Sequence, residues 1–192
     1  IQPFSSDFRG FLFQDSQLGV RFFGDRSNNI FQYNLAWFRR LEKDSNSGLN
    51  HISRKIRDDD IFIANLYWQD FPTLGFQSQI TGIYNKNNEG GDFFFNDNDF
   101  IERPASFGSE RGRNYDVAYF GYNGDGHFGR LNLTTSLYTA LGSNRDSAFT
   151  DETADIKAFF FAAEPSIDFD WIRLRASIVY ASGDDDPFDN TE

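Results

Sequence analysis

The residues best suited to chemistry in this sequence are arginines and carboxylates at even spacing. Arg173 and Arg175 flank a single leucine, and Glu164 and Asp168 lie shortly before them, four residues apart. In an extended chain, residues at even spacing point to the same face, so each pair would act together. A planar guanidinium can hold two carboxylate oxygens at once. Such a face can therefore bind anions or pair with the acidic groups of the protein itself.

The sequence offers little for catalysis. It contains no Cys, and its two His residues, His51 and His127, fall in an expected loop and an expected turn. No Gly-x-Ser-x-Gly elbow is present, and the glycine-rich segment 124–126 is not followed by the helix that a phosphate loop needs. We therefore expect no enzymatic activity, no cofactor and no metal site.

The elements that must position the charged residues are strands, because apolar side chains recur at every second position. Eight segments show this alternation, and they begin near Leu18, Phe31, Phe62, Leu74, Val117, Leu131, Phe159 and Ile172. Each is about 9–13 residues long, whereas strands of soluble proteins usually have about 5–6. A strand that crosses a bilayer at a tilt needs roughly 9–11 residues.

The connections between these segments alternate in length. Short connections are expected at residues 24–29, 70–73, 123–126 and 170–171, and long ones at residues 42–59, 85–114 and 142–155. An up-and-down barrel alternates in this way, whereas a β-sandwich with Greek-key connections does not. We predict an all-β, antiparallel, up-and-down transmembrane β-barrel, with a soluble β-sandwich or jelly roll as the alternative.

The same rule assigns the first residues and the extent of the domain. Residues 1–4 are expected to end an earlier strand, and residues 5–16 to form an outer loop, because the turn at 24–29 falls on the other side. We expect residues 1–192 to be a single β-barrel domain. Its eight strands would belong to a larger barrel, of which this sequence is a fragment truncated at both ends.

Composition agrees with this prediction without deciding it. The chain has a formal net charge of −11 and contains 24 Phe, 8 Tyr and 3 Trp, yet its mean hydropathy is polar. A barrel with apolar rings outside and polar groups inside has this composition, but a soluble domain can also bury its rings in a core. No apolar run reaches the 18 residues of a transmembrane helix. The acidic charge argues against nucleic acid as a partner.

Two short segments resemble a known family. Gln-Pro-Phe-Ser-Ser-Asp-Phe-Arg-Gly at residues 2–10 and Tyr-Ala-Ser-Gly-Asp-Asp-Asp-Pro at residues 180–187 resemble segments of large outer-membrane porins of the alginate-export type. The resemblance implies a barrel with about twice this strand count and a lumen that passes small or polymeric anions. No selectivity residue of that family is carried over to this chain.

The face predicted to line the lumen carries most of the charge within the strands. Its members are Arg21, Arg40, Arg130, Arg173 and Arg175, with Asp116, Glu164 and Asp168 as the acidic counterparts. These charges can pair with one another, or the arginines can form a basic track that selects anions. Both arrangements can occur in one wall.

The last two expected strands form a hairpin whose register can be predicted. A two-residue turn at 170–171 places Asp168 opposite Arg173, with Arg175 on the same face. A register slipped by one residue would turn both arginines outward, toward lipid. Pro165 would face outward and lack one ladder hydrogen bond, so we expect a bend or bulge there.

Aromatic and acidic residues are expected near the strand ends and in the loops. The predicted aromatic girdle at the lipid–water boundaries consists of Trp37, Tyr67, Trp68, Tyr84, Tyr119, Phe159, Trp171 and Tyr180. Acidic clusters at residues 58–60, 97–99 and 184–186 are expected in loops, as solvated charge or as divalent-ion bridges to lipopolysaccharide or a partner protein.

These expectations define a function to test. We expect a porin-like channel of the Gram-negative bacterial outer membrane, passing polar or anionic solutes, saccharides included, through a lumen lined by Arg, Gln and Asn. Its partners would be the lipid bilayer, lipopolysaccharide and a protein at the outer loops, with no nucleic acid. The alternative is a structural barrel, a scaffold or sheath that anchors or houses a partner protein in the outer membrane. A soluble binding module is a third reading.

Overall fold

Strands and turns make up the part of the chain that the structure describes. The computed structural model describes residues 2–39, 59–88, 94–95, 98, 101–103, 114–145, 147 and 152–183. None of these residues is helical. Among them, therefore, there is no helix of the length and apolar character that a membrane span requires.

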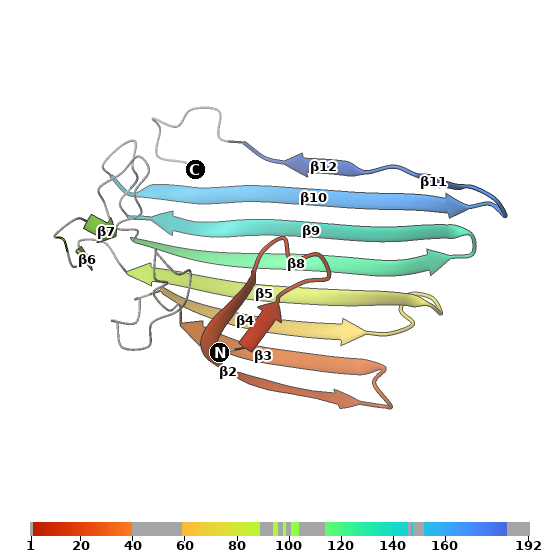
Figure 1. Ribbon diagram of the computed structural model, residues 1–192, viewed down its shortest axis with the longest axis horizontal. Helices are drawn as coiled ribbons and strands as arrows, with labels where there is room; N and C mark the ends of the chain where they lie inside the picture. Colours follow the sequence, from red (N-terminus) through yellow and green to blue (C-terminus); the bar gives the residue numbers. More distant parts are fainter. Residues whose placement is uncertain are drawn as a thin grey trace.

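Long antiparallel strands follow one another in chain order across a single sheet (Figure 1). They are β2 (Gln14–Arg26), β3 (Phe31–Arg39), β4 (Asp59–Trp68), β5 (Phe76–Asn88), β8 (Asn114–Phe128), β9 (Leu131–Asn144) and β10 (Ala154–Asp168). The short strands are β1 (Gln2–Ser5), which pairs with β2, and β11 (Arg173–Arg175) and β12 (Ile178–Ala181), which both pair with β10. A separate hairpin joins β6 (Phe94–Phe95) and β7 (Ile101–Arg103). The prediction of an all-β, antiparallel, up-and-down arrangement is confirmed.

The alternation of short and long connections is also confirmed, with shifted positions. Short connections at residues 27–30, 69–75, 129–130 and 169–172 lie together at one end of the sheet (Figure 1). The segment expected to turn, residues 123–126, instead lies inside β8 and pairs with β5. The turn comes later because Phe128 extends the ladder by pairing with Leu131, and Gly129 adopts the left-handed φ of +64° that this tight turn uses.

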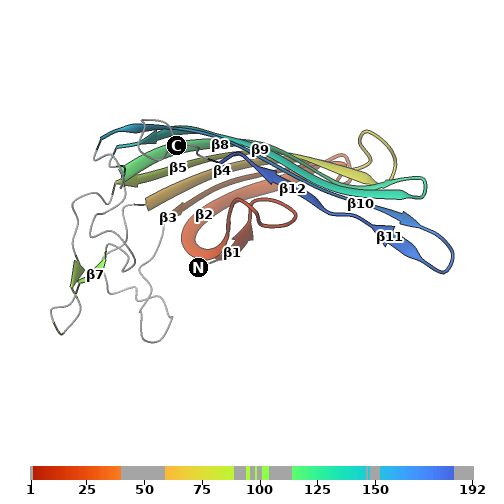
Figure 2. The ribbon, with the colours of Figure 1, turned by 90° about the horizontal axis from the view of Figure 1, so that it is seen from above.

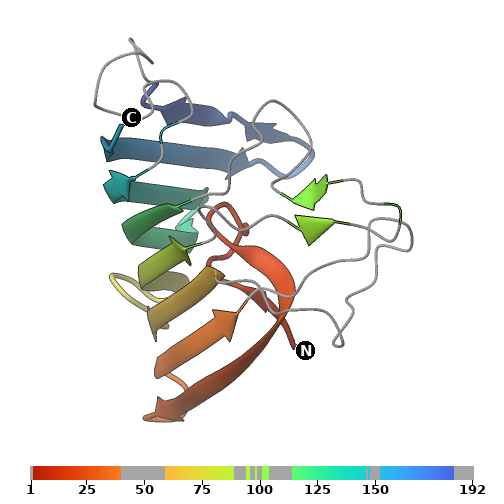
Figure 3. The ribbon, with the colours of Figure 1, turned by 90° about the vertical axis from the view of Figure 1, so that its left-hand side faces the viewer.

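The sheet curves but does not close. Viewed from one end, it bends around a concave side, with β2 and the β11–β12 segment at its two edges (Figure 3). Among the described residues these edges do not pair with each other, so these strands alone do not form a closed barrel.

A single register separates polar from apolar side chains along the curved sheet. On the convex face Trp37 lies opposite Phe62, and both are exposed. On the concave face Asn65 lies opposite Thr81, and both are buried. Alternation along each strand therefore produces an apolar convex face and a concave face on which polar side chains are buried.

Residues 2–17, here called the inner hairpin, lie on the concave side of the sheet (Figures 2 and 3). The expectation of an outer loop at residues 5–16 is wrong. The rings of Phe4 and Phe13 pack on the ring of Phe38, with centroids 5.3 and 5.8 Å away. These rings, with Ile61 and Ile63, belong to the main buried apolar cluster, which draws the hairpin onto the sheet.

The last hairpin has the predicted register. Asp168 lies opposite Arg173, and the backbone groups of Phe169 and Ile172 bond to each other across the two-residue turn. No bulge forms at Pro165, because the register on either side of it is the same. The ladder is instead interrupted between β11 and β12, where the Ala176 amide donates to the Pro165 carbonyl at 3.1 Å. Proline has no amide hydrogen to return that bond.

A glycine pair tests the packing of the concave face. A Cβ at Gly121 would lie 2.1 Å from the ring of Tyr138, which is fully buried, whereas a Cβ at Gly82 would meet nothing within 4 Å. We expect Gly121→Ala to lower the free energy of unfolding by about 1–3 kcal/mol through overpacking. Gly82→Ala is the matched control and should leave it nearly unchanged. Chemical unfolding in detergent measures both, and equal effects would contradict the packing described.

Candidate functional site

A polar cluster at the middle of the concave face binds the inner hairpin to the sheet. The Ser6 carbonyl oxygen accepts hydrogen bonds from Asn65 on β4 at 3.0 Å and from Gln79 on β5 at 2.6 Å. The Thr81 hydroxyl donates to the same oxygen at a longer 3.5 Å. All four residues are buried. Because buried amides and carbonyls need partners, these bonds fix the position of the hairpin on the sheet.

Asp7 holds the turn of the inner hairpin in shape. Its Oδ1 accepts from the amides of Arg9 and Phe11 at 2.9 and 3.1 Å, and its Oδ2 accepts from the Leu12 amide at 3.2 Å. The Ser6 hydroxyl donates to the same carboxylate at 3.1 Å. The carboxylate is buried, and hydrogen bonds from four donors compensate for the loss of water around its charge.

A charged cluster lies where the inner hairpin reaches β10. Glu164 forms ion pairs with Arg9 of the hairpin and with Arg175 of β11, each at 3.2 Å. Ser177 also donates to Glu164, at 3.4 Å. Nearby, Arg173 is bound to both carboxylate oxygens of Asp168. The arrangement can recognise anions, because its guanidinium groups remain partly exposed beside their carboxylates.

Five of the residues predicted to line a lumen share the concave face. They are Arg21, Glu164, Asp168, Arg173 and Arg175. The Arg21 guanidinium donates to Asn34 at 2.5 Å and lies 5.2 Å from the ring centre of Phe4. Arg21 is therefore packed against the inner hairpin.

Asp116 is not on the concave face, which corrects its predicted position. It lies opposite Lys86 on the convex side, accepts a hydrogen bond from the Tyr84 hydroxyl at 3.0 Å and pairs with Arg145. The two faces of β8 are the reverse of those predicted. The aromatic ring of Tyr119 was expected to face outward, but it faces the concave side. Aromatic residues on both sides of this strand remove the polarity contrast that identifies its faces.

Of the two remaining residues predicted to line a lumen, Arg130 alone belongs to the described part of the chain. Arg130 is exposed in the turn between β8 and β9, where its carbonyl accepts from the Asp168 amide at 3.3 Å. Its position in the turn follows from the shift of that turn to residues 129–130. Arg40 lies outside the described residues.

Arg9 is a site residue that the sequence reasoning missed. It was assigned to an outer loop, although residues 6–10 begin with Ser-Asp and end with Gly, a pattern typical of a tight turn. Gly10 adopts a φ of +68°, as such a turn requires. The turn could have been predicted from this pattern, but its docking on β4, β5 and β10 could not, because it depends on contacts distant in sequence.

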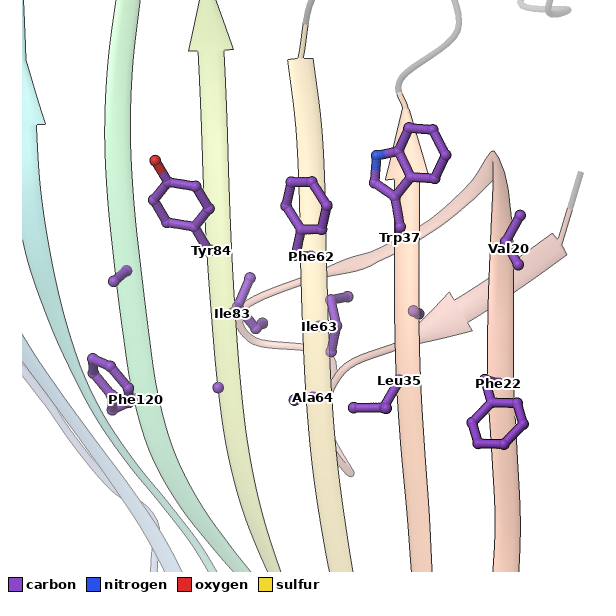
Figure 4. Close-up of a pocket in the computed structure, with 13 residues that line it drawn as sticks. Val20, Phe22, Leu35, Trp37, Phe62, Ile63, Ala64, Ile83, Tyr84 and Phe120 are labelled. Atoms are coloured by element: carbon purple, nitrogen blue, oxygen red, sulfur yellow. The ribbon is translucent and has the colours of Figure 1, made fainter.

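The convex face carries a shallow apolar depression (Figure 4). Its floor consists of small residues on neighbouring strands, Ala64, Gly82 and Ala118, and it is flanked by larger apolar side chains. Those are Val20, Phe22, Leu35, Trp37, Phe62, Tyr84 and Phe120. Phe22 is 63% exposed and Phe120 is 58% exposed. A continuous exposed patch of this kind marks a surface that contacts lipid or protein.

At the end of the sheet with long connections, the apolar face ends at charged residues. The Trp37 indole donates to Asp60 at 2.9 Å, and Arg39 pairs with the same carboxylate at 2.6 Å. Residues 59 and 60 were expected in an acidic loop, but they lie in β4, where the ladder with β5 extends to Asp59. Residues 58, 97, 99 and 184–186 lie outside the described residues.

The aromatic residues predicted to form a girdle are divided between the two faces of the sheet. Trp37, Trp68, Tyr84, Phe159 and Tyr180 share the convex face. Tyr67 and Tyr119 face the concave side instead, because each is an odd number of residues away from the convex positions of its own strand. Trp171 lies in the turn after β10 and is 87% exposed.

Comparison with known proteins adds no assignment: no protein-family model, no curated protein and no solved structure matches this chain. The interpretation of its function therefore depends on the two faces of the sheet and on the residues that they carry.

The turn of the inner hairpin can be tested through its carboxylate. Asp7→Ala leaves three partly buried backbone amides of the turn without their acceptor, so we expect a loss of about 1–3 kcal/mol in the free energy of unfolding. The hairpin should also become sensitive to protease. Asp25→Ala removes an exposed carboxylate of β2 and serves as the control. Unchanged protease resistance in the Asp7 variant would contradict the role given to this carboxylate.

Proposed function

We propose that this sheet is part of the wall of a β-barrel in the outer membrane of a Gram-negative bacterium, and that the barrel is a porin-like channel for polar or anionic solutes. The convex face would contact lipid and the concave face would line the lumen. The observation that carries the proposal is the contrast between a convex face of exposed apolar side chains, such as Phe22, Phe62 and Phe120, and a concave face on which polar side chains are buried.

The length of the apolar band suits a bilayer. On β9 the convex positions from Leu131 to Leu141 are all Leu or Thr. The ten steps from Leu131 to Leu141, at about 3.4 Å each, span roughly 34 Å. A strand tilted by about 40° then covers about 26 Å of depth, close to the roughly 25 Å apolar band of outer-membrane barrels.

The border of the band also suits a membrane surface. Trp37 and Tyr84 combine an exposed ring on the convex face with a hydrogen bond to a carboxylate, Asp60 or Asp116. Trp and Tyr favour the lipid–water boundary because one end of the side chain is apolar and the other is polar. These residues support a boundary at the end of the sheet with long connections, where lipopolysaccharide would be the neighbour.

The concave face supports passage of anions through a wall of mixed charge. Arg173 and Arg175 are paired with carboxylates, yet their side chains remain 55% and 56% exposed. These arginines can therefore be paired with carboxylates of the protein and still attract anions in the same wall. The ion pairs fix the orientation of each guanidinium, while its free edge can still meet a passing solute.

The open edges of the sheet support closure by further strands. The part of β2 from Leu18 to Arg26, which pairs only with β3, and the β11–β12 segment, which pairs only with β10, expose backbone amides and carbonyls along one side. A hydrocarbon environment cannot satisfy these groups, so a membrane sheet has to close on itself. The proposal therefore includes additional strands that pair with both edges.

A structural scaffold remains the second candidate, favoured by the inner hairpin on the concave face. A barrel whose interior is partly filled could house or anchor a partner protein and conduct little. The protein partner expected at the outer loops stays a prediction, because most of the long connections lie outside the described residues. Single-channel recording of the purified protein in planar bilayers separates the two candidates.

A pair of arginine substitutions tests which face contacts lipid. Leu137 lies on the convex face, and Leu137→Arg would place a charge in the bilayer at a cost of about 2–4 kcal/mol. Thr134→Arg, on the concave face beside Asp125 and Glu164, should be tolerated. The yield of heat-modifiable folded protein in lipid vesicles measures both. Equal yields for the two variants would contradict the assignment of the faces.

A charge reversal tests the lumen. Arg175→Glu places a second carboxylate beside Glu164, and we expect it to lower the anion-to-cation permeability ratio by roughly twofold or more. Arg26→Glu makes the same change at the exposed end of β2 and should alter the ratio little. Reversal potentials in a salt gradient give both ratios, and an equal shift in the two variants would show that Arg175 does not line the pore.

A further inference from the structure

We infer that the inner hairpin is a fixed constriction of the lumen and that Arg9 is the residue at which passing anions are selected. The inference rests on the proposed channel. The hairpin crosses the concave face instead of following one strand (Figure 1).

The contacts of the hairpin reach from one side of the sheet to the other. Phe13 packs on Phe38 of β3, and the Ser6 carbonyl is bound by side chains of β4 and β5. At the far side, the rings of Phe11 and Phe160 of β10 have centroids 5.1 Å apart. The hairpin therefore spans the concave side from β3 to β10, passing β4, β5, β8 and β9.

The hairpin is held too firmly to act as a loose plug. Its turn is closed by the Asp7 carboxylate, its middle by the bonds to the Ser6 carbonyl and its far side by the Arg9–Glu164 ion pair. Apolar packing of Phe4 and Phe13 adds to these contacts. An element fixed at several separated points narrows a pore by a constant amount.

The exposed surface of the hairpin favours anions. The Arg9 side chain is 28% exposed, and its neighbours in the turn, Phe8 and Phe11, are 37% and 44% exposed. The Asp7 carboxylate points into the turn and is bound by backbone amides, so a passing anion would meet the Arg9 guanidinium and not this carboxylate. Arg9 and Arg175 share the single carboxylate of Glu164, so these three side chains include one guanidinium more than carboxylates. Small carboxylates or phosphates are the solutes that such a point would favour.

The absence of cysteine from the chain allows a direct test. Arg9→Cys would be made in the full-length protein, purified, placed in planar bilayers and treated with a methanethiosulfonate reagent that carries a sulfonate. We expect the reagent to lower the single-channel current by roughly half, because it adds bulk and negative charge at the constriction. Trp171→Cys, in the exposed turn after β10, is the control and should show no change in current.

A second cysteine variant and two further substitutions of Arg9 separate the effect of bulk from the effect of charge. Phe8→Cys places the thiol on the same turn without removing the ion pair, and it should respond to the reagent in the same way. Arg9→Gln should lower the anion-to-cation permeability ratio by roughly twofold or more, whereas Arg9→Lys should preserve most of it. If both cysteine variants are modified, as mass spectrometry would show, and their currents do not change, the constriction is overturned. A wild-type protein that gives no current overturns the proposed channel itself, and the constriction with it.

Discussion

One continuous register, from β2 to β10, decides the surroundings of every side chain in this sheet. Each long strand pairs antiparallel with its neighbours in chain order. Whether a residue is at an even or an odd position of its strand therefore decides which face its side chain joins. A slip of one residue in any strand would exchange its buried amides with its exposed rings. Asn65 would then point to the convex side, and Phe62 would point to the concave side. The contrast between the two faces is therefore what makes the register specific.

The two faces have opposite requirements, and the same strands meet both. Buried side-chain NH2 groups on the concave side obtain an acceptor from the inner hairpin, as those of Asn65 and Gln79 do in the Ser6 carbonyl. The apolar groups on the convex side have no protein cover among the described residues. In the proposed barrel, lipid would supply that cover for the exposed convex rings, such as Phe22, Phe62 and Phe120.

The sequence predicted what depends on local pattern and missed what depends on distant contacts. The order of the strands, the side of the short turns and the pairing of Asp168 with Arg173 all follow from alternation and turn length. Asp116 was assigned to the wrong face because β8 carries aromatic residues on both sides. The inner hairpin was missed because its partners are far away in the chain: Ser6 and Gln79 are separated by 73 positions. No spacing rule within one strand can predict such a contact.

The inner hairpin also constrains the order in which the molecule can be assembled. Its docking surface is the inside of the curved sheet, formed by β3, β4 and β5 at one end and β10 at the other. A segment that lies inside a closed wall has to enter before the wall is complete. Its contacts with the early strands can form first, and its ion pair to Glu164 only when β10 has joined the sheet. In the proposed barrel the hairpin would thus be a folding template, around which later strands add in sequence before the edges meet.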